Sequence, residues 1–319
     1  MNTWILNTHG DPLGTLHNFL KQIWEKAGLE ALVVSANGHL VIDSPEELDE
    51  VNPFRPVMRI NTARLIPQIV EQRAGQKMGV ILRPCELRAL DELSRRNAVD
   101  EKSLLTICVD CLGTYSTQDY EWRADRKGSS RGLTKEALKF AMQGGINTYR
   151  YRPACQMCSN PGATDAGINI GVLGLPVRQN LLVTTPDGHL DWKAVTDGAA
   201  DEALRLKHEQ MLSKIRERGE ETRERLLKSM DATLPNSVDD LIEQFQACEE
   251  CQDCTSVCPI CAVDHPRRAD DGRYDREDLI NWLLSCAGCG MCEQACPKHI
   301  PLSTIFAHIR EMMAAELAA

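Results

Sequence analysis

Hydrophobic and polar positions follow helical and strand periods in turn through the first 195 residues. Apolar residues at 13, 16, 20, 23 and 24 share one face at helical spacing and predict a helix. Apolar runs at 77–82, 104–109, 168–172 and 181–185 predict strands, the last closed by a Pro-Asp-Gly turn at 186–188, and residues 86–95 predict a helix after the first run. Segments 30–35 and 39–42 flank an Asn-Gly turn at 37–38 and predict a hairpin. Ser44 followed by Pro45 and two acids predicts a helix start. These elements predict an α/β (α+β) domain over residues 1–195.

The pattern changes after about residue 199. Residues 201–228 are dense in Arg, Lys and Glu with thinly spaced apolar positions, which predicts a long, mostly exposed helix. We expect this linker, residues 196–236, to separate two domains. Ser237 starts a short helix, and further helices are predicted at 276–284 and 303–313. Residues 237–319 are therefore predicted to form a mostly helical, ferredoxin-like domain.

Charge and composition narrow the function classes. The formal net charge of −10 argues against nucleic acid as a partner. The apolar runs are far shorter than the roughly 20 residues that a membrane span needs, and no secretory signal is visible, so we expect no transmembrane segment and a cytoplasmic location. The 14 cysteines would then be in a reducing compartment, where clustered cysteines bind metal more often than they form disulfides.

The C-terminal cysteines form two copies of one motif. Each copy has the spacing C-x2-C-x2-C-x3-C followed by proline, the bacterial ferredoxin run in which three cysteines bind one 4Fe–4S cluster and the fourth binds the other. Zinc sites are the alternative, but zinc ribbons use two pairs and not a run of four. The spacing assigns cluster A to Cys248, Cys251, Cys254 and Cys296, and cluster B to Cys286, Cys289, Cys292 and Cys258. The long, helical connection between the copies resembles the all-helical ferredoxin module of heterodisulfide-reductase and fumarate-reductase iron–sulfur subunits.

Five more cysteines lie in the first domain, and four of them could bind a third 4Fe–4S cluster. The Cys155–Cys158 pair has metal-binding spacing, for which zinc is the rival, whereas an isolated cysteine is usually a small buried hydrophobe. The five positions are Cys85, Cys108, Cys111, Cys155 and Cys158.

The first domain resembles the beta subunit of coenzyme F420-reducing hydrogenases and related formate dehydrogenases. The resemblance follows the helix at 13–27, VILRPCELRAL at 80–90, TICVDCL at 106–112, RPACQMCSNPGATDAGINIG at 152–171 and a hairpin at 181–190, in that order. The formate dehydrogenase form also carries a C-terminal two-cluster module. The resemblance implies Cys85, Cys108, Cys155 and Cys158 as ligands of the third cluster, with Cys111 and Cys261 as spares. Spacing alone also allows Cys111 in place of Cys85.

The resemblance further implies FAD, which would split hydride chemistry into single electrons for the clusters. The chain departs from the family here, because a glycine pair is missing from the opening of the first helix. Gly14 and Thr15 could still approach a phosphate at a helix N-terminus, although a plain loop-to-helix turn also explains them. Arg83, Glu86 and Arg88 could line a flavin or docking cleft, or be ordinary helix charges.

The leading hypothesis is an iron–sulfur electron-transfer subunit of a multi-subunit oxidoreductase, of the formate dehydrogenase or hydrogenase type. Its partners would be a catalytic oxidoreductase subunit and another redox protein or carrier, docking on the long charged helix or the cysteine-rich end. No catalytic constellation is evident; His265 and His299 are explained as surface or supporting residues. The first alternative is a flavin-containing subunit that exchanges hydride with coenzyme F420 or a similar carrier, and the second is a zinc-binding adapter.

Overall fold

The computed structural model describes residues 2–36, 39–143, 150–186, 191–246, 248, 251–268 and 272–318. Its first part is built on one mixed sheet with the strand order β1-β7-β6-β5-β4-β2-β3. The central strands β2, β4, β5 and β6 are parallel, whereas β3, β7 and β1 pair antiparallel to their neighbours. The strands are β1 (Asn2–Asn7), β2 (Ala31–Ala36), β3 (His39–Ile42), β4 (Met78–Leu82), β5 (Leu104–Val109), β6 (Ile168–Gly171) and β7 (Asn180–Thr185).

The strands predicted from the sequence are all present, and β1 is an addition. The predicted hairpin is β2–β3, with Leu32 opposite Ile42. Its turn residues 37–38 lie outside the described residues, as do residues 187–190 of the turn and hairpin predicted after β7. The helix start at Ser44 is also confirmed: Glu47 accepts from the Ser44 N–H at 3.1 Å, and a short 3-10 helix, Pro45–Glu50, follows.

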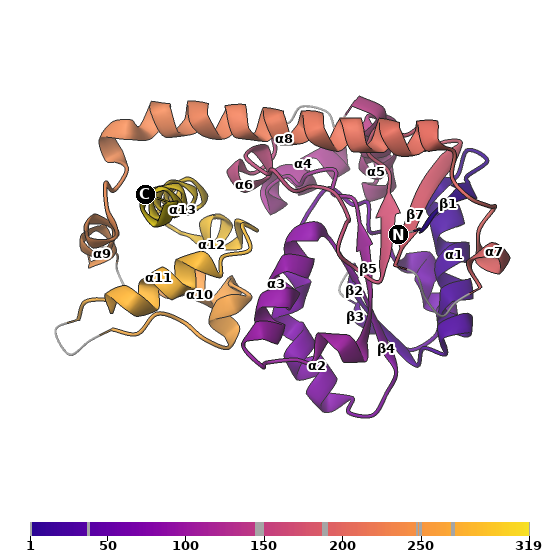
Figure 1. Cartoon of the computed structure of the whole chain (residues 1–319), viewed down its shortest axis with the longest axis horizontal. Helices are drawn as coiled ribbons and strands as arrows, with labels where there is room; N and C mark the ends of the chain where they lie inside the picture. The colour runs from indigo at the N-terminus through magenta and orange to yellow at the C-terminus, as the bar shows by residue number, and fades with distance from the viewer. Residues whose placement is uncertain are drawn as a thin grey trace.

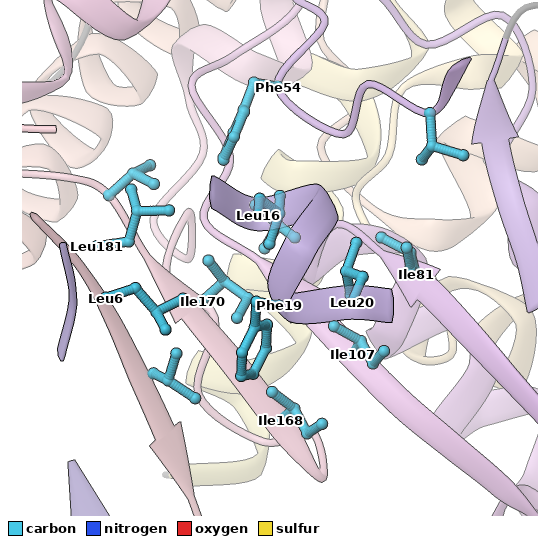
Figure 2. Close-up of a cluster of buried hydrophobic side chains, with 14 of the residues drawn as sticks. Leu6, Leu16, Phe19, Leu20, Phe54, Ile81, Ile107, Ile168, Ile170 and Leu181 are labelled. Atoms are coloured by element: carbon cyan, nitrogen blue, oxygen red, sulfur yellow. The ribbon is translucent and has the colours of Figure 1, made fainter. Parts of the chain in front are cut away.

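Helices cover both faces of the sheet (Figure 1). Helix α1 (Pro12–Ala27) lies on one face, and α2 (Ile66–Gln72) and α3 (Pro84–Arg95) lie on the other. Figure 2 shows Leu16, Phe19 and Leu20 of α1 over the strand residues Ile107 and Ile168. All five are at most 2% exposed, so the predicted apolar face of this helix is the centre of the main core.

Shorter helices occupy the connections, and a long one follows them. They are α4 (Thr117–Arg126), α5 (Ser130–Lys139), α6 (Pro153–Gln156) and α7 (Trp192–Val195). Helix α8 (Glu202–Met230) confirms the predicted long, mostly exposed helix. It does not simply separate the two parts: Ile215, Gly219 and Thr222 are buried, and Arg223 pairs with Glu311 of the C-terminal part at 2.6 Å. The helix therefore packs along both parts of the molecule (Figure 1).

The C-terminal part is helical, as predicted. Its helices are α9 (Val238–Gln246), α10 (Asp253–Val257), α11 (Arg276–Leu284), α12 (Met291–Ala295) and α13 (Leu302–Ala318). Leu241, Leu283 and Ile309 form the centre of a separate apolar core. The predicted fold class, an α/β region followed by a mostly helical one, is thus confirmed, while the boundaries at residues 195 and 236 stay predictions. In the part of the chain described above, no helix is both long and apolar enough to cross a membrane.

Candidate iron–sulfur centres

The two C-terminal cysteine runs fold in the same way. In each run a residue with left-handed backbone precedes a five-residue helix: Gln252 (φ 56°) before α10, and Gly290 (φ 66°) before α12. The third cysteine of each run is the second residue of the helix, and the fourth is its C-cap residue. The two runs therefore share one backbone conformation as well as one spacing. In each run the first three cysteines lie in or beside the loop and the start of the short helix, and the fourth lies at the other end of that helix.

The cysteines predicted for cluster A line one cavity of about 630 Å³, together with Cys292 and the spare Cys261. Cys251 is exposed, so this centre lies close to the molecular surface. The Sγ of Cys261 accepts a hydrogen bond from Nε1 of Trp282 at 3.1 Å. The structure thus brings the predicted set together and gives Cys261 a partner of its own. The predicted set is Cys248, Cys251, Cys254 and Cys296.

The cysteines predicted for cluster B affect each other's protonation. The pKa of Cys286 is raised to about 11, mainly by burial and further by the neighbouring Cys289 and Cys258. Burial and the other three thiols likewise raise the pKa of Cys292. Thiols so close together in a desolvated site ionise only when a cation neutralises them, and a bound metal centre would supply that cation. Cys258 from the first run therefore faces the second run, as the shared ferredoxin pattern requires.

The first domain contains a third cysteine pocket, between the sheet and the C-terminal part. It is lined by Cys85 at the start of α3, Cys111 after β5, Cys155 in α6 and Cys158 after α6, and also by Cys289. Cys108 does not line it. That side chain is fully buried in the apolar cluster beneath α2 and α3. The structure thus brings Cys111 together with Cys85, Cys155 and Cys158, and it places Cys108 away from them.

A buried carboxylate shapes the loop that carries Cys111. Asp110 accepts hydrogen bonds from the N–H groups of Ala163, Val172 and Leu173 at 2.8–3.0 Å and contacts Nε2 of His208 at 2.7 Å. Burial raises the pKa of Asp110, but His208 and the backbone donors outweigh it and hold the pKa below its usual value. Sequence reasoning missed this residue, although an acid inside the apolar run TICVDCL is a signal.

The electrostatics of the third pocket differ between its cysteines. Burial raises the pKa of Cys85 and of Cys158, and that of Cys111 to about 12. Burial acts on Cys155 too, but the Arg152 charge and a hydrogen bond with Thr114 outweigh it and lower its pKa. Among the thiols of this pocket, Cys155 is therefore the one whose ionisation its neighbours favour.

The third pocket and the cluster B loop are in direct contact. A Cβ on Gly290 would be 2.4 Å from Cβ of Ala154 in α6, so only glycine allows this approach. Nη2 of Arg88 donates to the carbonyl of Ala287 at 3.1 Å across the same boundary. Arg88, named above as a possible cleft residue, thus holds the two parts together.

The residues considered for a flavin are occupied by other contacts. The Asp11 carboxylate accepts from the Gly14 N–H at 3.1 Å and places a negative charge where a phosphate would bind, and Thr15 donates to the Thr8 carbonyl at 3.4 Å. The Arg83 guanidinium donates to the carbonyls of Arg55 and Val57. The Glu86 carboxylate, 1% exposed, accepts from Thr62 and from the Arg83 N–H. Each of these four residues is therefore bound to other protein groups. His265 and His299 are exposed.

Known proteins resemble this chain in sequence and in fold. Residues 247–300 match the 4Fe–4S dicluster domain family. The chain is 21% identical over 283 residues to the F420-dependent formate dehydrogenase subunit beta of Methanocaldococcus jannaschii, over 75% of this chain and 72% of that protein. A chain of the xenon-derivatized F420-reducing [NiFe] hydrogenase complex from Methanosarcina barkeri has a similar fold, with a TM-score of 0.51 and 16% identity over 70% of this chain and 91% of that one. The predicted resemblance is confirmed, and the C-terminal region contains the match to the 4Fe–4S dicluster domain family.

Proposed function

We propose that this protein is an iron–sulfur electron-transfer subunit of a multi-subunit oxidoreductase of the formate dehydrogenase or hydrogenase type. The observation that carries the proposal is the third cysteine pocket, whose wall includes Cys289 of the cluster B loop. A catalytic subunit and a second redox protein or carrier would be its partners. The cytoplasmic location expected from the sequence stays a prediction.

The proposal assigns twelve cysteines to three 4Fe–4S clusters. Clusters A and B keep the ligands that the spacing predicts, with one cysteine exchanged between the runs. The third cluster takes Cys85, Cys111, Cys155 and Cys158, because these four line one pocket while Cys108 is packed in an apolar core. When bound, each cluster carries one electron at a time.

The arrangement gives the clusters a linear order. Cys289 lines the third pocket and is also a ligand of cluster B, so these two centres are neighbours. Cluster B is joined to cluster A through the exchanged cysteines, and cluster A lies nearest the surface at Cys251. Electrons would pass between the third cluster and cluster A by way of cluster B, and the cysteine-rich end would be one docking surface.

A flavin-containing subunit that exchanges hydride with coenzyme F420 or a similar carrier is the alternative. It is less well supported, because Gly14, Thr15, Arg83 and Glu86 are each bound to other protein groups. No part of the proposal uses a flavin.

The test is the iron and flavin content of the anaerobically purified protein. We expect about twelve iron atoms per chain, four for each cluster, and no flavin. The variant Cys111→Ala should lose about four iron atoms, whereas the matched control Cys108→Ala should keep all of them. About eight iron atoms in the unmodified protein would remove the third cluster from the proposal, and one flavin per chain would favour the alternative. If Cys108→Ala loses iron and Cys111→Ala does not, the ligand set implied by the resemblance is favoured.

A further inference from the structure

Arg152 is a buried cation at the contact between the third pocket and the cluster B loop. It is 5% exposed and is the residue before α6. In the described parts of the chain, no carboxylate lies within ion-pair distance of its guanidinium. A buried charge without a partner is very unfavourable, so this one needs a negative group nearby. The groups that supply it are sulfur atoms.

The guanidinium directs its donors to two residues of the third pocket. Nε donates to Oγ1 of Thr114 at 2.9 Å, and Nη2 lies 3.7 Å from Sγ of Cys155. Thr114 Oγ1 also lies 3.2 Å from Cys155 Sγ, and a thiolate at this position has no proton to give, so the Thr114 hydroxyl would donate to it. The Cys155 sulfur thus receives one charged and one neutral donor, which suits a thiolate bound to iron.

The other end of the guanidinium reaches the second centre. Nη1 donates to Sδ of Met291 at 3.4 Å, and Met291 lies directly before Cys292 of cluster B. Arg152 also interacts electrostatically with Cys85 and with Cys289, one from each cysteine set. One fixed positive charge therefore acts on both centres.

We propose that Arg152 raises the reduction potential of the third cluster and, to a smaller extent, that of cluster B. This inference rests on the proposed function. Reduction adds one negative charge to a cluster, and a nearby fixed cation stabilises the more negative form. Hydrogen bonds to the ligand sulfurs and net charge are among the factors that set cluster potentials. Arg152 thus acts on electron transfer through the cluster ligands, because its charge makes reduction of the third cluster more favourable.

The experiment is an anaerobic redox titration of the full chain, followed by electron paramagnetic resonance and accompanied by iron counting. Arg152→Gln removes the charge, Arg152→Lys keeps it, and Thr114→Val removes only the hydroxyl group. Arg126→Gln, at an exposed position of α4, is a control with the same change of net charge. In Arg152→Gln we expect reduction of the third cluster to be about tenfold less favourable, which is about 59 mV for one electron. Cluster B should shift less and cluster A not at all, Arg152→Lys should restore most of the potential, and Thr114→Val should give a smaller shift.

Each outcome decides the question. An unchanged third-cluster potential in Arg152→Gln with full iron would overturn the proposal, and so would an equal shift in Arg126→Gln. If Arg152→Gln loses the third cluster, retention of iron and potential in Arg152→Lys supports the role of the charge. Iron loss in both variants rejects it in favour of a purely structural role. Failure of the proposed function is distinct, because it shows as absence of the third-cluster signal in the unmodified protein.

Discussion

Replacing Gly219 by alanine tests whether α8 closes the third cysteine pocket. Gly219 lies in the middle of this helix, where alanine normally stabilises by about 0.5–1 kcal/mol. Here a Cβ would lie 2.6 Å from the carbonyl oxygen and 3.1 Å from the carbonyl carbon of Cys158, whereas ordinary contact begins at 3.4 Å. The obstructing atoms are backbone, so either the helix or the Cys158 loop must move.

The two effects have opposite signs, and the structure decides between them. Overpacking of a close contact costs about 1–3 kcal/mol, which exceeds the gain in helix propensity. We therefore expect Gly219→Ala to lower the free energy of unfolding by about 1–2 kcal/mol. Because the displaced loop carries Cys158, the variant should also hold the third cluster less firmly than clusters A and B.

The assay is thermal unfolding of the anaerobic protein, with iron content measured after mild chelation. Gly132→Ala in α5 is the matched control, because its Cβ would meet Lys127 at 3.4 Å, an ordinary contact. We expect the control to be as stable as the unmodified protein or slightly more stable. A Gly219→Ala protein with equal stability and full iron would refute the close packing of α8 on this pocket.

Two further predictions concern pH. Burial opposes the charged form of His208, but the Asp110 carboxylate outweighs burial and raises the pKa of His208. The stability that this pair contributes is therefore complete below the unfolded histidine pKa of about 6.5, and it is lost as pH rises through the folded pKa. His208→Ala should lower the free energy of unfolding by about 3 kcal/mol at pH 6 and by less at pH 9, and a pH-independent loss measured by urea unfolding would contradict this. Burial raises the pKa of Glu101 most, the Asp91 carboxylate raises it further, and the result is about 7. The ionised Glu101 carboxylate therefore lowers the stability of the protein increasingly as pH rises from the unfolded pKa of Glu101 toward 7 and above. Glu101→Gln should raise the melting temperature at pH 8 but not at pH 4, unlike Glu220→Gln at an exposed position of α8, and equal effects of the two variants would count against the carboxyl pair.

The parts of the fold that local patterns determine were predictable. Helix α11 has the predicted bounds, Arg276–Leu284, because its capping residue and its apolar positions lie within a few residues of each other. Strands β4 and β5 followed from their apolar runs. Strand β1 was missed, because its pairing with β7 depends on residues almost 180 positions away.

The third ligand set shows where local patterns stop being sufficient. Cys108 and Cys111 are three residues apart, and nothing in TICVDCL decides which of them faces the pocket. The decision comes from distant groups: the Cys111 N–H donates to the Pro161 carbonyl at 2.8 Å, and residues 163, 172 and 173 bind Asp110. Likewise, the charged pattern of α8 predicted its exposed face but not the contact of Gly219 with the Cys158 loop.

The closed wall of the third pocket also determines when the pocket can be completed during synthesis. Four cysteines of the first domain leave the ribosome early, but Ile215 and Arg218 of α8, and then Gly288 and Cys289, are needed to enclose them. The cysteines of clusters A and B, by contrast, all lie between positions 248 and 296. A nascent chain that ends before residue 288 therefore presents its first-domain thiols on an open surface. The proposed third cluster would therefore be enclosed only after the C-terminal part has been made, although its four ligands are made first.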